Sequence, residues 1–197
     1  EQFTPIARLS AEPLVLVVHP ARPWKSVAEL VADAKRRPGE LHYSSPGNGG
    51  PQHLAMELIK LDTGIDIVHV PYKGFAGAIT DVMAGHVQAM VAGLQSAHPL
   101  VSGGRLRMLA VMTGERSPAF PGVPTMKEAG VSGTEMGAAS WYGVFAPAGS
   151  PAAVVMRLHR EVAKSLQDAP TRERLVALQL EPAGTPPAEF GKFVAAA

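Results

Sequence analysis

The 197-residue chain has no cysteine, few aromatic residues, few charges and no long apolar run. The absence of cysteine excludes disulfides, thiolate metal sites and thiol nucleophiles. Charged residues make up only 18% and the net charge is +1. Because a nucleic-acid surface needs clustered basic side chains, we expect no nucleic-acid partner. The longest clear apolar run covers residues 14–18, far below the roughly 18 residues of a membrane-spanning helix.

Glycine and proline are abundant, with 20 and 18 residues, and hydrophobic residues make up 46% of the chain. Such a chain can build a core from many short elements joined by tight turns. Short β-branched apolar runs predict strands at residues 14–18, 41–44, 67–70, 87–92 and 108–112. Helical spacing predicts helices after Ser26, from Pro51, around 76–83 and around 96–101. This alternation predicts an α/β domain with a mainly parallel sheet flanked by helices.

The expected core faces of these helices follow from their apolar spacing. The inner stripes are predicted to be Leu54, Leu58 and Leu61, then Ala76, Ile79 and Met83, and in a later helix Val155, Leu158, Val162 and Leu166. That later helix begins at Pro151, and further helices are expected at 171–178 and from 185 onward. An extended segment at 140–147 places Trp141 and Tyr142 on opposite faces, so one of them should belong to the core.

A glycine-rich loop between Ser44 and His53 is the first candidate site. A strand ends there and a helix begins at Pro51, so its free backbone N–H groups and the helix dipole favour an anion. A phosphate loop is not indicated, because no Lys-Ser/Thr pair follows and Gln52 stands where a dinucleotide fingerprint needs glycine. The neutral loop therefore suits a carboxylate. A tight turn without a ligand remains the alternative.

Two further strand ends are candidates because ligands of open α/β sheets bind at this edge. One carries Tyr72 and Lys73, and the other runs from Ala92 to Ser96. A proline turn with a solvated lysine, and simple close packing, remain open for these two. The seven histidines show no metal-ligand spacing, and no Gly-x-Ser-x-Gly motif occurs. We therefore expect no metal, no cofactor and no catalytic constellation.

Several motifs, taken in order, resemble one family. They are residues 16–20, 26–30, the glycine-rich loop with His53-Leu54, 68–74, 118–125, 128–130 and 140–151. Together they resemble the Bug (TctC-type) solute-binding proteins of bacterial tripartite tricarboxylate transporters. The resemblance implies a periplasmic, non-enzymatic receptor with two α/β lobes of the periplasmic-binding-protein type (type II). Its expected partners are a small carboxylate and the membrane permease subunits of the transporter.

The resemblance also implies that the chain is a piece of a longer protein, lacking most of the first lobe and a stretch after residue 194. We expect an incoming crossing segment at 1–12, the second ligand-binding lobe at 13–136 and a crossing or hinge segment at 137–150. Residues 151–197 are expected to be the C-terminal part of the first lobe. Such a piece should bind ligand weakly, and the surface exposed by truncation is a candidate dimer interface.

The family's binding loops transfer to matching positions here. They are Ser44, Ser45, Gly47, Asn48, Gly49, Gly50, His53, Tyr72, Lys73, Gly74, Ala92 and Trp141. Many members have an aspartate where Ala92 stands, which favours an organic or aromatic acid over an amino acid as ligand. Two alternatives stay open: an extracytoplasmic carboxylate sensor for a signalling partner, and an enzyme using Lys73 or His53 as base.

Overall fold

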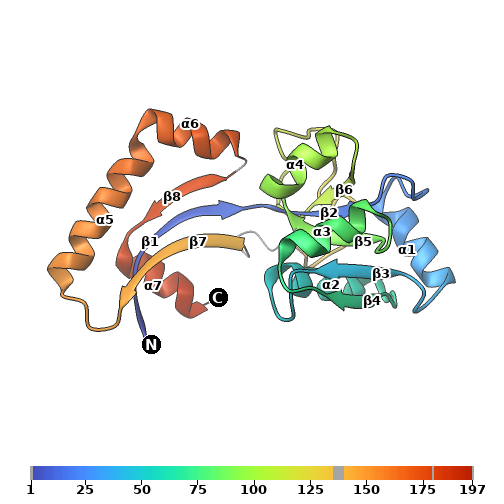
Figure 1. Ribbon diagram of the computed structural model, residues 1–197, viewed down its shortest axis with the longest axis horizontal. Helices are drawn as coiled ribbons and strands as arrows, with labels where there is room; N and C mark the ends of the chain where they lie inside the picture. Colours follow the sequence, from blue (N-terminus) through green and yellow to red (C-terminus); the bar gives the residue numbers. More distant parts are fainter. Residues whose placement is uncertain (1, 135–139, 179, 197) are drawn as a thin grey trace. The chain divides into compact units, whose positions relative to one another are not determined.

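The computed structural model describes residues 2–134, 140–178 and 180–196. The chain forms two compact units (Figure 1). Unit 1 comprises Glu1–Glu12 and Ser140–Ala197, and unit 2 comprises Pro13–Ala139. Positions 135–139 lie outside the described residues, and with them the end of the expected second lobe and the start of the expected hinge segment. Among the described residues no helix has the length and apolar character to cross a membrane.

Unit 2 contains the elements predicted for residues 14–112, with ends that differ by at most two residues. They are β2 (Leu14–Val18), α1 (Val27–Arg36), β3 (His42–Ser45), α2 (Pro51–Thr63), β4 (Val68–Pro71), α3 (Phe75–Met83), β5 (Ala89–Gly93), α4 (Leu94–Ser102) and β6 (Arg107–Val111). The α/β fold class is therefore confirmed. Ser26 caps α1, accepting the Glu29 N–H at 3.2 Å, as the predicted capping box requires.

The sheet of unit 2 has the order β4-β3-β5-β2-β6. Strand β3 runs parallel to β4 and β5, whereas β2 runs antiparallel to β5 and β6. Of these five strands only β2 runs against the others, so the sheet is mixed but mainly parallel, as expected. As a consequence, β3, β4, β5 and β6 end at one edge of the sheet, which we call the carboxyl edge, and β2 ends at the opposite edge.

Side chains of β2 alternate between the two faces of this sheet, as the period of a strand requires. Leu14, Leu16 and Val18 pack into a core with α1 and α2. Val15 and Val17 pack into a second core with α3 and α4. Because both faces are covered by helices, the run of five apolar residues in β2 is fully buried.

The buried stripes of two helices differ from the predicted ones. In α2 the buried residues are Ala55, Met56 and Ile59, whereas Leu54 is 48% and Leu61 is 81% exposed. The predicted leucine stripe is adjacent to the buried face around the helix axis. The prediction therefore chose the wrong one of two neighbouring faces of α2. In α3, Ile79 is buried as predicted and Met83 packs partly buried against the same core, but Ala76 is exposed, and the other fully buried residues are Ala78 and Val82.

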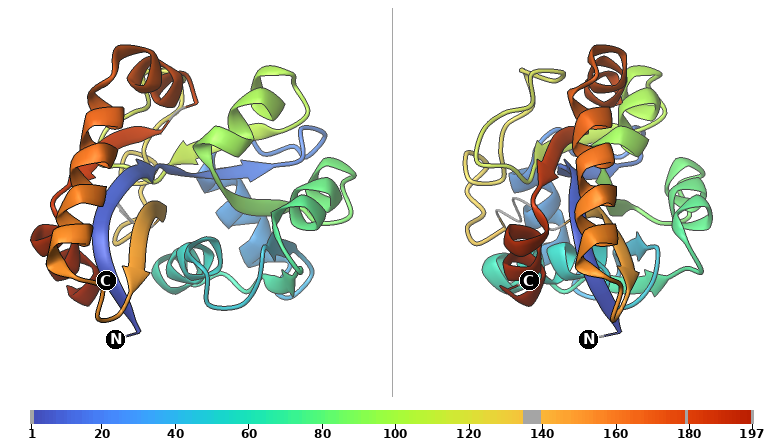
Figure 2. Two further views of the ribbon diagram at one scale, coloured as in Figure 1. Left: turned by 60° about the vertical axis from the view of Figure 1, so that its left-hand side comes forward. Right: turned by 90° about the vertical axis from the view of Figure 1, so that its left-hand side faces the viewer.

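In its described residues, unit 1 is a three-stranded antiparallel sheet in the order β7-β1-β8 with three helices. Its elements are β1 (Phe3–Glu12), β7 (Ser140–Pro147), α5 (Ala152–Gln167), α6 (Ala169–Ala177), β8 (Glu181–Thr185) and α7 (Pro187–Ala196). Helix α5 lies along the sheet beside β1 (Figure 2). Val155 of α5 packs on Ile6 and Ala146, while Leu158, predicted to face inward, is 42% exposed.

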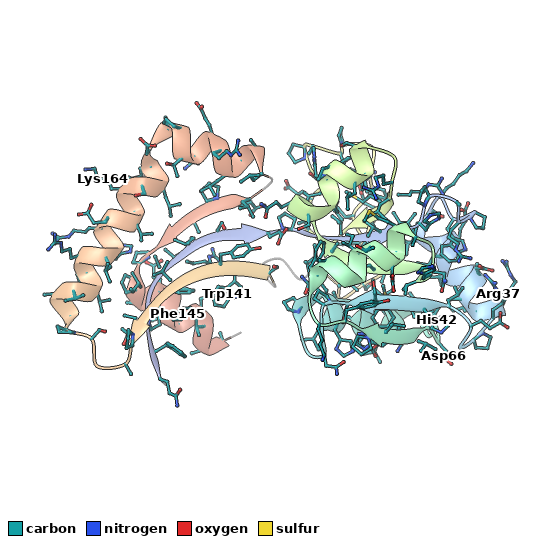
Figure 3. The ribbon with its side chains drawn as sticks, in the orientation of Figure 1. Arg37, His42, Asp66, Trp141, Phe145 and Lys164 are labelled. Carbon is teal, nitrogen blue, oxygen red and sulfur yellow. The ribbon has the colours of Figure 1, made fainter. Side chains whose placement is uncertain are left out.

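Aromatic side chains occupy the other face of this sheet. Trp141 and Phe145 are four residues apart on β7 and therefore face the same side of the sheet (Figure 3). Their ring centroids lie 5.3 and 5.1 Å from that of Phe190 in α7. Tyr142 points away and is 48% exposed. The opposite orientation of the two adjacent aromatics is therefore confirmed, and Trp141 is the one that packs.

Candidate functional site

Three helices of unit 2 begin at the carboxyl edge without a side-chain cap. Their N-cap residues are Gly50 of α2, Gly74 of α3 and Gly93 of α4, and none of the three first turns contains an acidic residue. Helix α1 begins on the other edge and has both Ser26 as cap and an acid, Glu29, in its first turn. In α4 the Leu94 N–H donates to the Pro13 carbonyl at 2.8 Å. With this exception, the three helix starts bring free N–H donors and positive dipole ends to one edge.

Helix α2 shows these donors most clearly. The Leu54 N–H donates to the Gly50 carbonyl at 3.0 Å and is the first to do so in this helix. In the described part of the chain, the N–H groups of Gly50, Gln52 and His53 find no acceptor. Pro51, at the first helical position, has no N–H to satisfy. Three donors are thus available to an anion at this helix start.

The two serines of the loop already have partners inside the protein. Ser44 is fully buried, and its hydroxyl donates to the Ala78 carbonyl at 3.1 Å. The expectation that this hydroxyl contacts a ligand is corrected, because the alternation along β3 turns Ser44 toward α3. Ser45 Oγ lies 2.9 Å from the Gly47 carbonyl and 2.7 Å from His69 Nε2, so the Ser45 hydroxyl shapes the loop itself.

Asn48 and Lys73 are the exposed polar side chains of the two loops that follow β3 and β4. Asn48 projects from the loop tip, beside Gly49, whose left-handed backbone (φ 75°) suits glycine. Lys73 follows β4 and is exposed, and it makes no ion pair with any described residue. A cation next to the N-terminus of α3 gives the ends of β3 and β4 a positive character.

Tyr72, also predicted to line the site, is turned away from it. Its hydroxyl donates to the Asp81 carboxylate of α3. That hydrogen bond raises the pKa of Tyr72 to about 12 and holds the pKa of Asp81 below its usual value. Sequence analysis had no signal for this contact, which depends on how α3 packs on the sheet.

An aromatic stack lies under the loop, between β3, β4 and α2. The rings of His53 and His69 stack with centroids 4.1 Å apart, and Tyr43 stacks on His69 at 4.8 Å. Tyr43 donates to Glu57, which also pairs with Lys60 at 2.8 Å. Burial lowers the pKa of His69 and raises the pKa of Tyr43.

His53 contacts the end of the glycine-rich loop, and His69 contacts its beginning. His53 Nδ1 accepts the Gly49 N–H at 3.1 Å, and His69 reaches Ser45. His69 was not among the predicted site residues. The signal that could have found it is the parallel pairing of β3 with β4, which sets Tyr43 opposite His69.

Two predicted site residues, Ala92 and Trp141, pack against protein side chains elsewhere in the structure. Ala92 lies inside β5 and is fully buried in the core with α3 and α4. Trp141 belongs to unit 1, where its ring packs on α7. A ligand contact by Trp141 stays a prediction. Among the described residues no cluster of three histidine, aspartate or glutamate side chains could hold a metal ion.

Comparison with known proteins gives consistent matches along the whole chain. The profile of the tripartite tricarboxylate transporter family receptor (TctC) matches residues 1–197. Protein BugT of Bordetella pertussis is 34% identical over 195 residues, which cover 99% of this chain and 59% of BugT.

Two relatives of this chain were solved with carboxylate ligands. Rpa4515 of R. palustris, solved with adipate, is 38% identical with a TM-score of 0.93, covering 99% of this chain and 64% of that one. MatC from Rhodopseudomonas palustris, solved with bound malate, is 28% identical with a TM-score of 0.84, covering 91% and 60%. The chain thus spans about three fifths of the length of these relatives.

Proposed function

Because the chain belongs to the TctC family of tripartite tricarboxylate transporter receptors, we propose that it forms the anion-binding part of a receptor for a small carboxylate. This is a family of periplasmic binding proteins, not of enzymes. The receptor would deliver its ligand to the membrane permease subunits of a tripartite transporter. Transport is favoured over the sensing alternative by the family description alone.

The observation that carries the proposal is the set of uncapped N-termini at the carboxyl edge. Gly50, Gly74 and Gly93 start three helices whose first turns contain no acid. Backbone N–H groups at such positions bind carboxylates through charge-assisted hydrogen bonds. Lys73 adds an exposed cation that would attract an anion and retain it near α2.

A dicarboxylate is the ligand class that we favour. Adipate and malate, found in Rpa4515 and MatC, each carry two carboxylates and no ammonium group. In this chain no Asp or Glu occurs at 46–53, 71–77 or 92–97, so nothing at these strand ends would pair with the ammonium of an amino acid. Of the predicted contacts, the proposal keeps the backbone of residues 47–50, Asn48, His53 and Lys73.

Thermal melting tests the proposal directly. A ligand at five times its Kd stabilises a folded protein by about 1 kcal/mol, which raises Tm by about 2–4 °C in a chain of this size. We expect adipate or malate, at tens of millimolar, to produce such a rise. Hexanediamide, the neutral analogue of adipate, and sodium chloride of equal ionic strength should not. Equal shifts with all three would contradict specific carboxylate binding.

A further inference from the structure

His53 stands at the third position of its helix, which a capping box fills with glutamate or glutamine. In a capping box, this side chain accepts the backbone N–H of the N-cap residue. Helix α1 has a variant of this contact, in which Glu29 accepts the N–H of Lys25, one residue before the N-cap, at 2.5 Å. Helix α2 makes the same connection with an imidazole, since His53 Nδ1 accepts the Gly49 N–H at 3.1 Å.

The exchange of a carboxylate for an imidazole has a chemical consequence. A carboxylate in the first turn of α2 would repel an anion bound there, whereas a neutral imidazole closes the loop without charge. Nδ1 can accept the Gly49 N–H only while it carries no proton. A histidine ordinarily changes charge between about pH 5 and 8, so this loop contact, unlike that of Glu29, is open to control by pH.

His69 contacts the start of the same loop. Its ring stacks on His53 at 4.1 Å, and its Nε2 lies 2.7 Å from Ser45 Oγ, which in turn contacts the Gly47 carbonyl. Because the Ser45 hydroxyl donates to the Gly47 carbonyl, His69 Nε2 donates to Ser45 Oγ and keeps this N–H when the ring is protonated. The Gly49 contact therefore responds to the proton on His53, and His69 supports that ring by stacking on it.

Other charged groups also face the two rings. From α2, Glu57 and Lys60 approach, paired with one another at 2.8 Å. From β3, Tyr43 stacks on His69 and donates to Glu57. Burial lowers the pKa of His69, and a charge on His53 lowers it further. The surroundings therefore favour the neutral form of His69.

We propose that His53 and His69 form a proton-operated clamp on the ligand loop. While His53 is neutral, the two imidazoles hold residues 45–50 in the observed conformation with three helical N–H groups exposed. Protonation removes the acceptor of the Gly49 N–H and loosens the loop. The consequence for ligand affinity rests on the proposed carboxylate-binding function, whereas the clamp itself does not.

Amide exchange of the 197-residue chain tests the clamp without ligand. We expect the protection factor of the Gly49 amide, corrected for the intrinsic pH dependence of exchange, to fall about two- to tenfold between about pH 8 and pH 5.5. The fall should follow the imidazole ¹⁵N signals of His53. In His53→Gln, whose amide oxygen accepts at every pH, the Gly49 protection should stay constant. Constant protection in the wild type while His53 titrates, or an unchanged fall in His53→Gln, would overturn the clamp.

His19→Gln is the matched control. His19 Nδ1 also accepts a backbone N–H, that of Ala21 at 3.2 Å, but it follows β2 at the opposite edge. This variant should retain the wild-type pH response of Gly49, and a lost response would contradict the assignment to His53. Should His53→Gln not fold, the wild-type ring signals decide, because protonation at Nδ1 must coincide with the loss of Gly49 protection.

Titration with adipate then measures the functional consequence. The second carboxyl of adipate ionises less readily than an isolated carboxyl, because the first already carries a negative charge, so part of the ligand loses one charge at pH 5.5. His53→Gln measures this effect of the ligand. We expect wild-type affinity to fall about two- to tenfold more than that of His53→Gln from pH 8 to pH 5.5. An equal change in both proteins would contradict the clamp. If adipate binds neither protein while Gly49 protection still responds to pH, the proposed function fails and the clamp stands.

Discussion

The Gly74 N–H donates to the Pro46 carbonyl at 2.9 Å. A second bond runs from the Tyr72 N–H to the Ser45 carbonyl at 3.0 Å. The loops after β3 and β4, which the sequence presents as two separate ligand contacts, are therefore one hydrogen-bonded piece. A change in either loop should be transmitted to the other.

Gly74→Ala tests how far this piece depends on its backbone conformation. Gly74 has φ 112°, a backbone conformation that residues other than glycine rarely adopt. We expect a loss of about 1–3 kcal/mol in the free energy of unfolding, measured by urea denaturation. Gly114→Ala is the control, because nothing lies within 4 Å of its added Cβ. Equal effects of the two substitutions would show that the Gly74 conformation carries no strain.

Ser44→Ala tests the correction made to the predicted site. The Ser44 hydroxyl donates to the Ala78 carbonyl in the core, so its removal should lower the free energy of unfolding by about 1 kcal/mol. The rise in Tm produced by adipate should be unchanged. Ser102→Ala, at the exposed end of α4, should change neither quantity. Loss of the adipate response in Ser44→Ala alone would restore this side chain to the ligand site.

The positions of most unit 2 elements could be predicted because strand and helix periods are local. The run at 14–18 became β2 without change, and Ser26 caps α1 as its spacing requires. The direction of β2 could not be predicted, because a buried apolar run has the same pattern in either direction. The predicted buried face of α2 was also wrong. Leu54 and Ala55 belong to neighbouring faces of the helix, and only its packing against the sheet decides which face is buried.

Asp33 should make stability depend on pH in the acid range. The Arg37 guanidinium, then Arg36 and the Trp24 indole N–H, hold the pKa of this buried carboxyl below its usual value. The folded protein then binds the proton less readily than the unfolded chain. Its contribution is therefore present above about pH 4 and is lost as the pH falls further.

Asp33→Asn should lower the free energy of unfolding at pH 7 by about 2 kcal/mol and flatten its decline between about pH 5 and pH 3. Guanidinium chloride denaturation at a series of pH values measures both effects. Asp66→Asn is the control, because Asp66 is exposed and makes no ion pair with a described residue. A decline equally steep in Asp33→Asn and wild type would exclude Asp33 as its source.

The candidate site was only partly visible in the sequence. The loop, its glycines and the helix start at Pro51 are local features, and each is present. The imidazole stack was not visible, because His53 and His69 meet only through the parallel pairing of β3 with β4. The sequence also could not show that the Tyr72 hydroxyl donates to Asp81, because that contact depends on how α3 packs on the sheet.

Lys73→Gln should weaken carboxylate binding. An exposed charge near a bound anion contributes up to about 1 kcal/mol, so we expect affinity for adipate to fall about two- to fivefold. Lys25→Gln is the matched control, an exposed lysine just before α1 at the opposite edge. Equal losses in both variants would assign the effect to net charge and not to position.

The most direct test is amide chemical-shift mapping of the ¹⁵N-labelled chain during titration with adipate. Carboxylate binding at the carboxyl edge should produce the largest changes at the N–H groups of Gly50, Gln52 and His53, which lack acceptors among the described residues. Hexanediamide should leave these signals in place. The account would be contradicted if these three signals stay unmoved while adipate shifts others, or if hexanediamide moves them equally.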